Sequence, residues 1–127
     1  IILGEIRGVE VLDVLQAMNT GHDGSMSTVH ANSAMDSLLR LEMLVGLTGQ
    51  RVPEQTLRQM LCSALDIIVQ ITRLSNGRRC VSEILEVLEV RDGVYVTNSL
   101  FSLDRRGSGQ FVRTAQPGGL KFRQVLL

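Results

Sequence analysis

The spacing of apolar residues changes along the chain, and each change predicts a different kind of element. Residues 1–6 and 24–31 are short runs with the apolar or alternating character of strands. Between them, residues 9–19 carry apolar side chains at helical spacing, namely Val9, Leu12, Leu15 and Met18. The order strand, helix, strand predicts a βαβ unit, whose crossover makes the two strands parallel.

The two strands of this unit are expected to end at the same edge of their sheet. Open α/β folds bind ligands at the carboxyl ends of parallel strands. Glu5 lies at the end of the first run, and His30 lies at the end of the second. We therefore predict that this carboxylate and this imidazole lie side by side.

The middle of the chain predicts two helices and a strand. Ser33 is suited to be the N-cap of a helix that runs to about Leu47 and is ended by Gly49. Pro53 begins the next helix, at a position where proline is tolerated. Residues 66–74, which are rich in Ile and Val, then predict a strand.

The last part of the chain predicts an antiparallel meander. Turn sequences typical of hairpins occur at Asn76-Gly77, Asp92-Gly93 and Gly107-Ser108-Gly109. They separate predicted strands at residues 66–74, 79–90, 94–103 and 110–114. The predicted fold class is therefore α/β, with a parallel βαβ half followed by an antiparallel β meander.

Composition restricts the classes of function. The 127 residues fit one domain, and thirteen basic residues balance thirteen acidic ones. We therefore expect no broad electrostatic capture of nucleic acid. No apolar run approaches a membrane span. Because Ile1 is not a start methionine and stands inside an apolar run, we expect a piece of a longer protein.

The candidate catalytic residues are Glu5, His22 and His30. Nucleotide hydrolases use a carboxylate at a strand end to orient Mg²⁺ or the attacking water. The same residue is also typical of a solvated strand end or of an ion pair, here with Arg7. Imidazoles can donate to a phosphate oxygen, although His22 is equally suited to cap the preceding helix. A metal site that includes Asp23 is a further alternative.

Three more side chains are candidates for nucleotide binding or coupling. Thr28 shares a strand face with His30 and carries a hydroxyl. Arg7 and Arg40 can neutralise phosphate charge, or each can pair with a nearby acid, namely Glu42, Glu5 or Glu10. The methionines are expected to fill the core, and they are Met18, Met26, Met35, Met43 and Met60.

Two motifs make the chain recognisable. One is Gly-Glu-Ile-Arg-Gly at residues 4–8, and the other runs from Thr-Gly-His at residues 20–22 to His-Ala-Asn at residues 30–32. They resemble the Walker B element and the His box of the type II/type IV secretion ATPase family. The chain is most similar to the CpaF-like branch, which powers assembly of tight-adherence (Flp-type) pili.

This resemblance implies that residues 1–127 are the C-terminal part of a RecA-like P-loop ATPase domain. It implies a homo-hexameric motor that hydrolyses ATP and acts on an inner-membrane platform protein. Such a motor is cytoplasmic and peripheral to the inner membrane. Glu5 then takes the place of the catalytic glutamate, and His22 and His30 take the places of the family histidines that contact the γ-phosphate.

Some parts of that family pattern are missing from the chain. No Gly-x-x-x-x-Gly-Lys-Ser/Thr run is present, and Gly4 stands where many nucleotide hydrolases have an Mg²⁺-binding aspartate. We therefore expect ATP and Mg²⁺ to be held mainly by upstream parts, and the isolated fragment to be inactive. Two other hypotheses are a non-catalytic ring-packing or interaction domain and a metal-dependent hydrolase that uses His, Asp and Glu.

Overall fold

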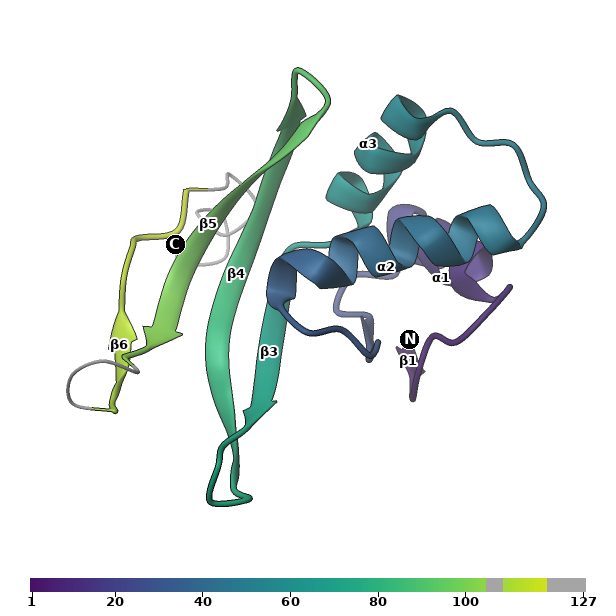
Figure 1. Ribbon diagram of the computed structural model, residues 1–127. Coiled ribbons are helices and arrows are strands. Elements are labelled where there is room, and N and C mark those ends of the chain that lie inside the picture. Colours follow the sequence, from purple (N-terminus) through teal and green to yellow (C-terminus); the bar gives the residue numbers. More distant parts are fainter. Residues whose placement is uncertain (105–108, 119–127) are drawn as a thin grey trace. The chain divides into compact units, whose positions relative to one another are not determined.

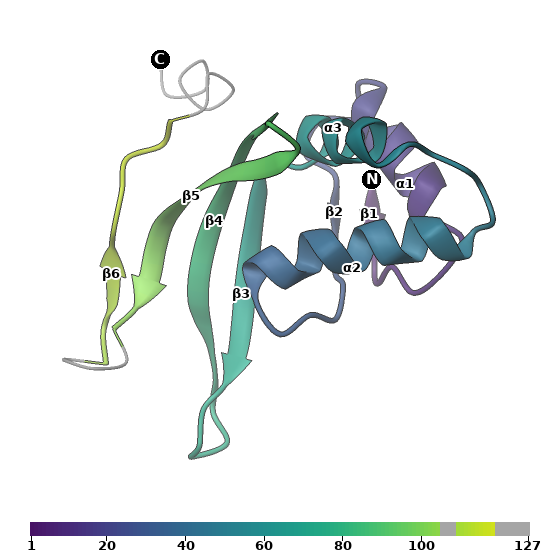
Figure 2. The same cartoon turned by 45° about the horizontal axis from the view of Figure 1, so that its top comes forward.

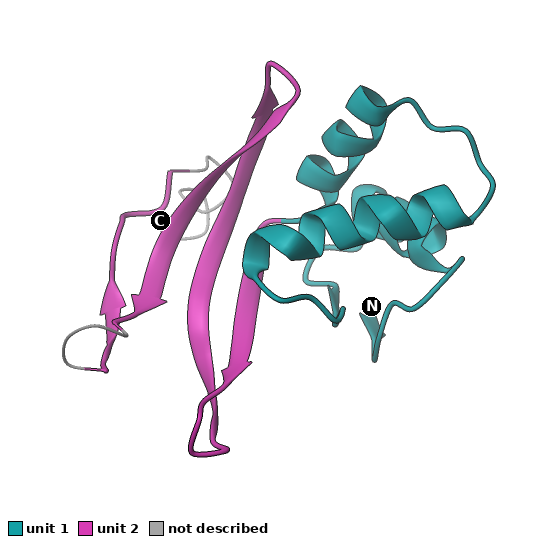
Figure 3. Ribbon diagram, in the orientation of Figure 1, with its two compact units in different colours: residues 1–65 teal, residues 66–127 magenta. Residues whose placement is uncertain are grey.

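The computed structural model describes residues 1–104 and 109–118 and divides the chain into two compact units (Figure 3). The first is Ile1–Leu65 and the second is Asp66–Leu127. The elements follow each other along the chain as in Figure 1. They are β1 (Ile2–Leu3), α1 (Val11–Asn19), β2 (Met26–Ser27), α2 (Ala34–Leu47), α3 (Glu54–Ala64), β3 (Ile67–Arg73), β4 (Arg79–Arg91), β5 (Val94–Leu103) and β6 (Phe111–Arg113).

The first unit contains the predicted βαβ arrangement. β1 and β2 are parallel, with Ile2 opposite Met26 and Leu3 opposite Ser27. The helix α1 connects them, and α1, α2 and α3 pack against one another beside this strand pair (Figure 2). The parallel half of the predicted fold class is confirmed.

Both strands of the pair are shorter than predicted. Runs of six and eight residues were expected at positions 1–6 and 24–31, and each strand has two residues. Main-chain bonds continue the pairing beyond them, because the Met26 amide donates to the Ile1 carbonyl and the Ile6 amide donates to the Thr28 carbonyl. Parallel strands are typically flanked by further strands, and the described sheet contains only this pair.

The helices bury the leucine-rich faces that their spacing predicted. Ser33 caps α2, where its Oγ accepts from the Asp36 amide at 3.0 Å. The α2 helix ends before Gly49, which has a φ of +78°. The buried residues of this unit are Ile6, Val11, Leu15, Ala34, Ser37, Leu38, Leu41, Leu44, Val45, Leu57, Leu61 and Cys62.

Two details of the predicted core are wrong. Val9 was assigned to the apolar face of the first helix, but α1 begins at Val11 and Val9 is exposed. Three of the methionines expected in the core, Met26, Met35 and Met43, are exposed. The α2 helix carries apolar residues on more than one face. The spacing of its apolar residues alone therefore does not predict which of those faces is buried.

The second unit is the predicted antiparallel meander, in the order β3-β4-β5-β6 (Figure 1). The first turn is a three-residue loop in which Gly77, at φ +83°, donates its amide to the Leu74 carbonyl. The second turn has positive φ at both Asp92 and Gly93, the form that matches the twist of a tight hairpin. The turn predicted at residues 107–109 lies mostly outside the described residues.

Candidate functional site

Glu5 is the centre of a small cluster of charged side chains just after β1. His30 Nε2 lies 3.1 Å from Glu5 Oε1, and Arg7 Nη2 lies 2.6 Å from Glu5 Oε2. The Glu5 side chain is 21% exposed, whereas those of Arg7 and His30 are 77% and 89% exposed. The predicted meeting of Glu5 and His30 is therefore confirmed, and the ion pair with Arg7 is also formed.

The parallel pairing brings these residues together. The Ile6 amide donates to the Thr28 carbonyl at 2.8 Å, so the two chains remain side by side after β1 and β2 end. The Thr28 hydroxyl donates to the Gly4 carbonyl at 2.6 Å, which adds a second tie at the same place. Thr28 therefore joins the two strand ends, and its oxygen keeps acceptor capacity.

Charge at the cluster favours the ionised carboxylate. The hydrogen bond from Arg7 holds the pKa of Glu5 below its ordinary value. Partial burial opposes this shift, and the electrostatic interactions with Arg7 and His30 add to it. The same hydrogen bond raises the pKa of Arg7. Glu5 is therefore a negatively charged group with a weakened affinity for a proton while Arg7 is bound to it.

Glu10 fixes the turn that carries Arg7. One carboxylate oxygen of Glu10, Oε1, accepts from the backbone amides of Arg7 at 2.6 Å and Gly8 at 3.0 Å. These bonds lower the pKa of Glu10. The sequence suggested Glu10 only as a possible ion-pair partner of an arginine, whereas its carboxylate accepts from the backbone amides of Arg7 and Gly8.

His22 occupies a different position from the Glu5 cluster. Its Nδ1 lies 3.0 Å from the Ala17 carbonyl in the last turn of α1, and its backbone carbonyl accepts from Ser25 Oγ at 2.6 Å. This is the helix-capping contact given above as the alternative for His22. The side-chain contact of His22 therefore joins it to the end of α1 rather than to Glu5.

Arg40 lies on α2 with an exposed side chain. The acid suggested as its partner, Glu42, instead pairs with Arg58 of α3 at 2.9 Å. Arg58 also pairs with Glu54 at 2.5 Å. The pairing of Arg40 with Glu42 was therefore wrong, because neighbouring helices supplied a better placed arginine.

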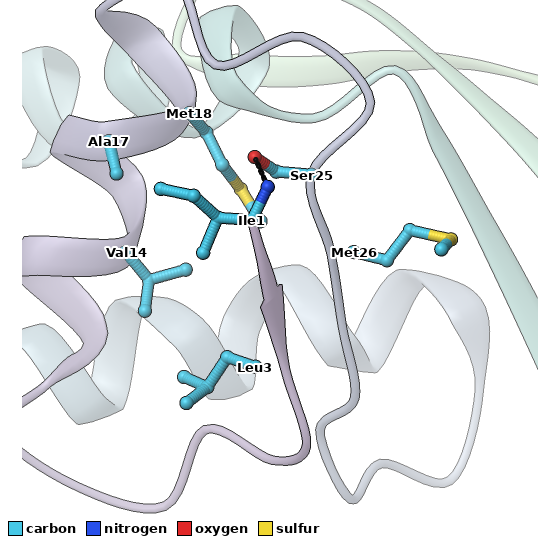
Figure 4. A pocket seen from close by; sticks show the side chains of 7 residues that line it. All are labelled: Ile1, Leu3, Val14, Ala17, Met18, Ser25 and Met26. Atoms are coloured by element: carbon cyan, nitrogen blue, oxygen red, sulfur yellow. Dashed lines mark hydrogen bonds between the residues drawn. The ribbon is translucent and has the colours of Figure 1, made fainter.

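Other possible binding places in the first unit do not include the charged cluster. Figure 4 shows a small apolar hollow of about 10 Å³ between α1 and the strand pair, which is barely large enough for one water. An open groove of about 640 Å³ lies along α1 and α3 and is rich in amide side chains such as Gln16 and Gln59. Within residues 1–104 and 109–118, no three His, Cys, Asp or Glu side chains gather closely enough to hold a metal ion.

No helix among the described residues has the length and apolar character needed to cross a membrane.

Comparison with known proteins decides the family. Residues 1–124 match the model of a family described as "Type II/IV secretion system protein". The chain belongs to this family. The family resemblance inferred from the sequence motifs is confirmed at that level, and the mixed α/β fold agrees with it.

Individual relatives in this family are conjugation and type IV secretion proteins. A conjugal transfer protein TrbB from Rhizobium radiobacter is 39% identical over 76% of this chain and 28% of its own length. The type IV secretion system protein PtlH from Bordetella pertussis is 41% identical over 66% of this chain and 26% of its own length. The chain thus spans little more than a quarter of these relatives.

A solved structure supports the same fold. The crystal structure of the VirB11 ATPase from the Brucella suis type IV secretion system, in complex with sulphate, matches with a TM-score of 0.60 and 30% sequence identity. The match covers 65% of this chain and 26% of that one. The matched part of this chain thus shares its fold with part of an ATPase.

Proposed function

We propose that residues 1–127 form the C-terminal part of a RecA-like secretion ATPase domain and carry part of its ATP-hydrolysing site. The observation that supports this most is the meeting of Glu5 and His30 at the ends of two parallel strands, 3.1 Å apart, in a chain of this family. A carboxylate and an imidazole at such an edge are suited to a nucleotide γ-phosphate.

In this proposal Glu5 is the catalytic carboxylate. One of its oxygens orients a water molecule and accepts a proton as the water oxygen bonds to the γ-phosphorus. The bond from that phosphorus to the β–γ bridging oxygen breaks, and ADP leaves with the electron pair. His30 donates to a γ-phosphate oxygen and holds Glu5 in place, and His22 couples the same event to movement of α1.

Arg7, Thr28 and Arg40 take part in nucleotide binding or coupling in this proposal. Arg7 is in the cluster, and Thr28 ties its two strands together. Arg40 lies on α2 and is not among the partners of Glu5, so its role depends on where the nucleotide extends.

Binding of ATP with Mg²⁺ needs parts beyond this chain. Mg²⁺ prefers octahedral oxygen ligands, and Gly4 offers no side chain at the position where many nucleotide hydrolases have an aspartate. Proteins usually hold Mg²⁺ through one or two carboxylates together with substrate phosphates and waters, and no three His, Cys, Asp or Glu side chains gather among the described residues. We assign the phosphate-binding loop and the metal ligands to other parts of the full-length protein.

The finer assignment is a homo-hexameric motor of the CpaF-like branch that powers pilus assembly or secretion. It would act from the cytoplasm on an inner-membrane platform protein, peripheral to the membrane. The two sequence motifs support this branch. The conjugal transfer and type IV secretion relatives support the broader role in transport across the envelope.

The test is Glu5→Gln in the full-length protein. We expect ATP binding to persist and turnover to fall by about 10²-fold or more, because the amide cannot accept the proton. Binding is measured by calorimetry and turnover by phosphate release. Glu89→Gln, which alters an exposed carboxylate in β4, is the matched control and should leave both unchanged.

Other outcomes of this experiment separate the alternatives. Turnover that survives Glu5→Gln would contradict the catalytic role of Glu5. A full-length wild-type protein that assembles into rings without hydrolysing ATP would favour the ring-packing hypothesis, and stoichiometric zinc by elemental analysis would favour the metal-dependent hydrolase. Hydrolysis by purified residues 1–127 alone would contradict the expected inactivity of the fragment.

A further inference from the structure

Each oxygen of the Glu5 carboxylate has a charged or polar partner in this structure. Oε2 is bound by Arg7 at 2.6 Å and Oε1 lies 3.1 Å from His30. A carboxylate that orients water and accepts a proton needs an oxygen that faces the water. A water molecule at Oε2 would therefore compete with the Arg7 guanidinium for that oxygen.

We propose that Arg7 is a latch on Glu5, which opens when the terminal phosphate of ATP draws the guanidinium away from the carboxylate. This inference rests on the proposed function, since it assigns the regulation of the same site. The released oxygen, Oε2, then faces the attacking water, while the contact with His30 keeps Glu5 oriented.

The exposure of Arg7 makes such a movement feasible. Its side chain is 77% exposed, so few packing contacts restrain it, whereas Glu5 is mostly covered. Ion pairs with one exposed partner are weak because solvent screens them. A phosphate group carries more charge than a carboxylate and offers three oxygens, and guanidinium groups bind it in a bidentate manner. The phosphate is therefore the stronger partner for Arg7.

The backbone beneath Arg7 is fixed, so the motion is confined to the side chain. Glu10 Oε1 accepts from the Arg7 and Gly8 amides and anchors the turn at the start of α1. The Arg7 side chain can therefore rotate away from Glu5 without a shift of β1 or α1. Glu10 is a positioning residue in this scheme because it acts through the backbone of Arg7.

The consequence of the latch is a coupling between phosphate binding and activation of Glu5. While Arg7 is bound, the pKa of the Glu5 carboxylate is lowered and its Oε2 is held by the guanidinium. ADP lacks the terminal phosphate and leaves the latch closed. ATP opens the latch. Glu5 is therefore released from Arg7 only when the bound nucleotide has a γ-phosphate that can be hydrolysed.

The test compares nucleotide affinities in the full-length protein. We expect Arg7→Gln to weaken binding of the non-hydrolysable analogue adenylyl imidodiphosphate and to leave ADP binding unchanged. The expected change in Kd is about tenfold, which corresponds to the loss of one charge-assisted hydrogen bond. Arg7→Lys should restore part of the lost affinity, because lysine keeps the positive charge but cannot bind phosphate in the bidentate manner of a guanidinium. Arg51→Gln, an exposed arginine ahead of α3, is the matched control and should change neither affinity.

A second comparison examines the competition between carboxylate and phosphate. Glu5→Gln removes the negative charge that binds Arg7, so it should increase the affinity for the ATP analogue. This increase in affinity should be smaller when Arg7→Gln is also present. An equal gain in both backgrounds would overturn the latch. So would an Arg7→Gln variant with an unchanged ratio of ATP-analogue to ADP affinity.

These outcomes are distinct from a failure of the proposed function. If Glu5→Gln abolishes turnover while Arg7→Gln leaves both affinities unchanged, Glu5 is catalytic and the latch is wrong. If turnover survives Glu5→Gln, the proposed function fails and the latch, which rests on it, fails as well.

Discussion

The two units of this chain pair their strands in different ways. In the first, Ile2 pairs with Met26, and the residues between them include a whole helix. In the second, each strand pairs with the next one along the chain through a short turn. The pairing through short turns includes long strands such as β4, whereas the strands β1 and β2, which a whole helix separates, have two residues each. The candidate site therefore lies where strand pairing is least extensive.

Each unit also has a carboxylate with a distinct environment. Glu5 in the first unit is partly exposed and has charged partners, Arg7 and His30. Glu86 in the second is 1% exposed and accepts from Asn98 Nδ2 at 3.2 Å and from the Gly118 amide at 2.8 Å. The partners in an exposed ion pair can be exchanged for a ligand, whereas hydrogen bonds to a buried carboxylate hold a structure together. The same residue type thus suits a reactive role in one unit and a structural role in the other.

The largest expected effect is in the core of the first unit. Leu44→Ala removes a fully buried side chain from α2 and should lower the free energy of unfolding by about 2–5 kcal/mol. The hydrogen-exchange rates of backbone amides in residues 1–65 should rise, and those in the meander should change little. Leu39→Ala, on the exposed side of the same helix, is the control. Equal acceleration in both units would show that they open as one cooperative block.

A smaller effect is expected for the buried carboxylate of the second unit. Glu86→Ala leaves the Asn98 and Gly118 donors without this acceptor and should cost about 1–3 kcal/mol of stability. Urea denaturation measures the cost, and the exchange rate of the Gly118 amide should rise. Glu89→Ala, at an exposed position of the same strand, should have little effect. An unchanged Gly118 amide would contradict the anchoring role of Glu86.

The smallest expected effect is a pH dependence in the first unit. The pKa values of Glu5 and Glu10 lie below the ordinary value of 4.5, so each ionised carboxylate stabilises the folded state above that pH. This contribution is lost as the pH falls from 4.5 through the lowered folded-state values. Glu10→Gln should therefore flatten the acid side of the stability profile, measured by urea denaturation at a series of pH values. A profile as steep as that of the wild type would refute this, and Glu89→Gln serves as the reference.

Features that depend on a few adjacent residues were predictable from the sequence. The Asp92-Gly93 hairpin follows from two residues that tolerate positive φ. The Ser33 cap follows from a hydroxyl followed by an acid in the first helical turn. The meeting of Glu5 and His30 was also predictable, because a βαβ crossover fixes the direction of both strands.

Features that depend on distant neighbours were not predictable. The lengths of β1 and β2 depend on which strands flank them, which the two apolar runs do not state. The burial of Glu86 was missed because β4 and β5 shift register between Ile84 and Leu85 and again between Val87 and Glu89. Such bulges interrupt the alternation of faces on which a strand prediction depends.

The open edges of the β1–β2 pair have a practical consequence for work on this stretch alone. Ile2 is 77% exposed and Met26 is 60% exposed, and they stand opposite each other beside main-chain groups that no described strand covers. Unpaired apolar edges recruit further strands, so purified fragments will stack through this surface as they are concentrated. Light scattering over a dilution series, recorded before any denaturation curve, would separate that association from folding.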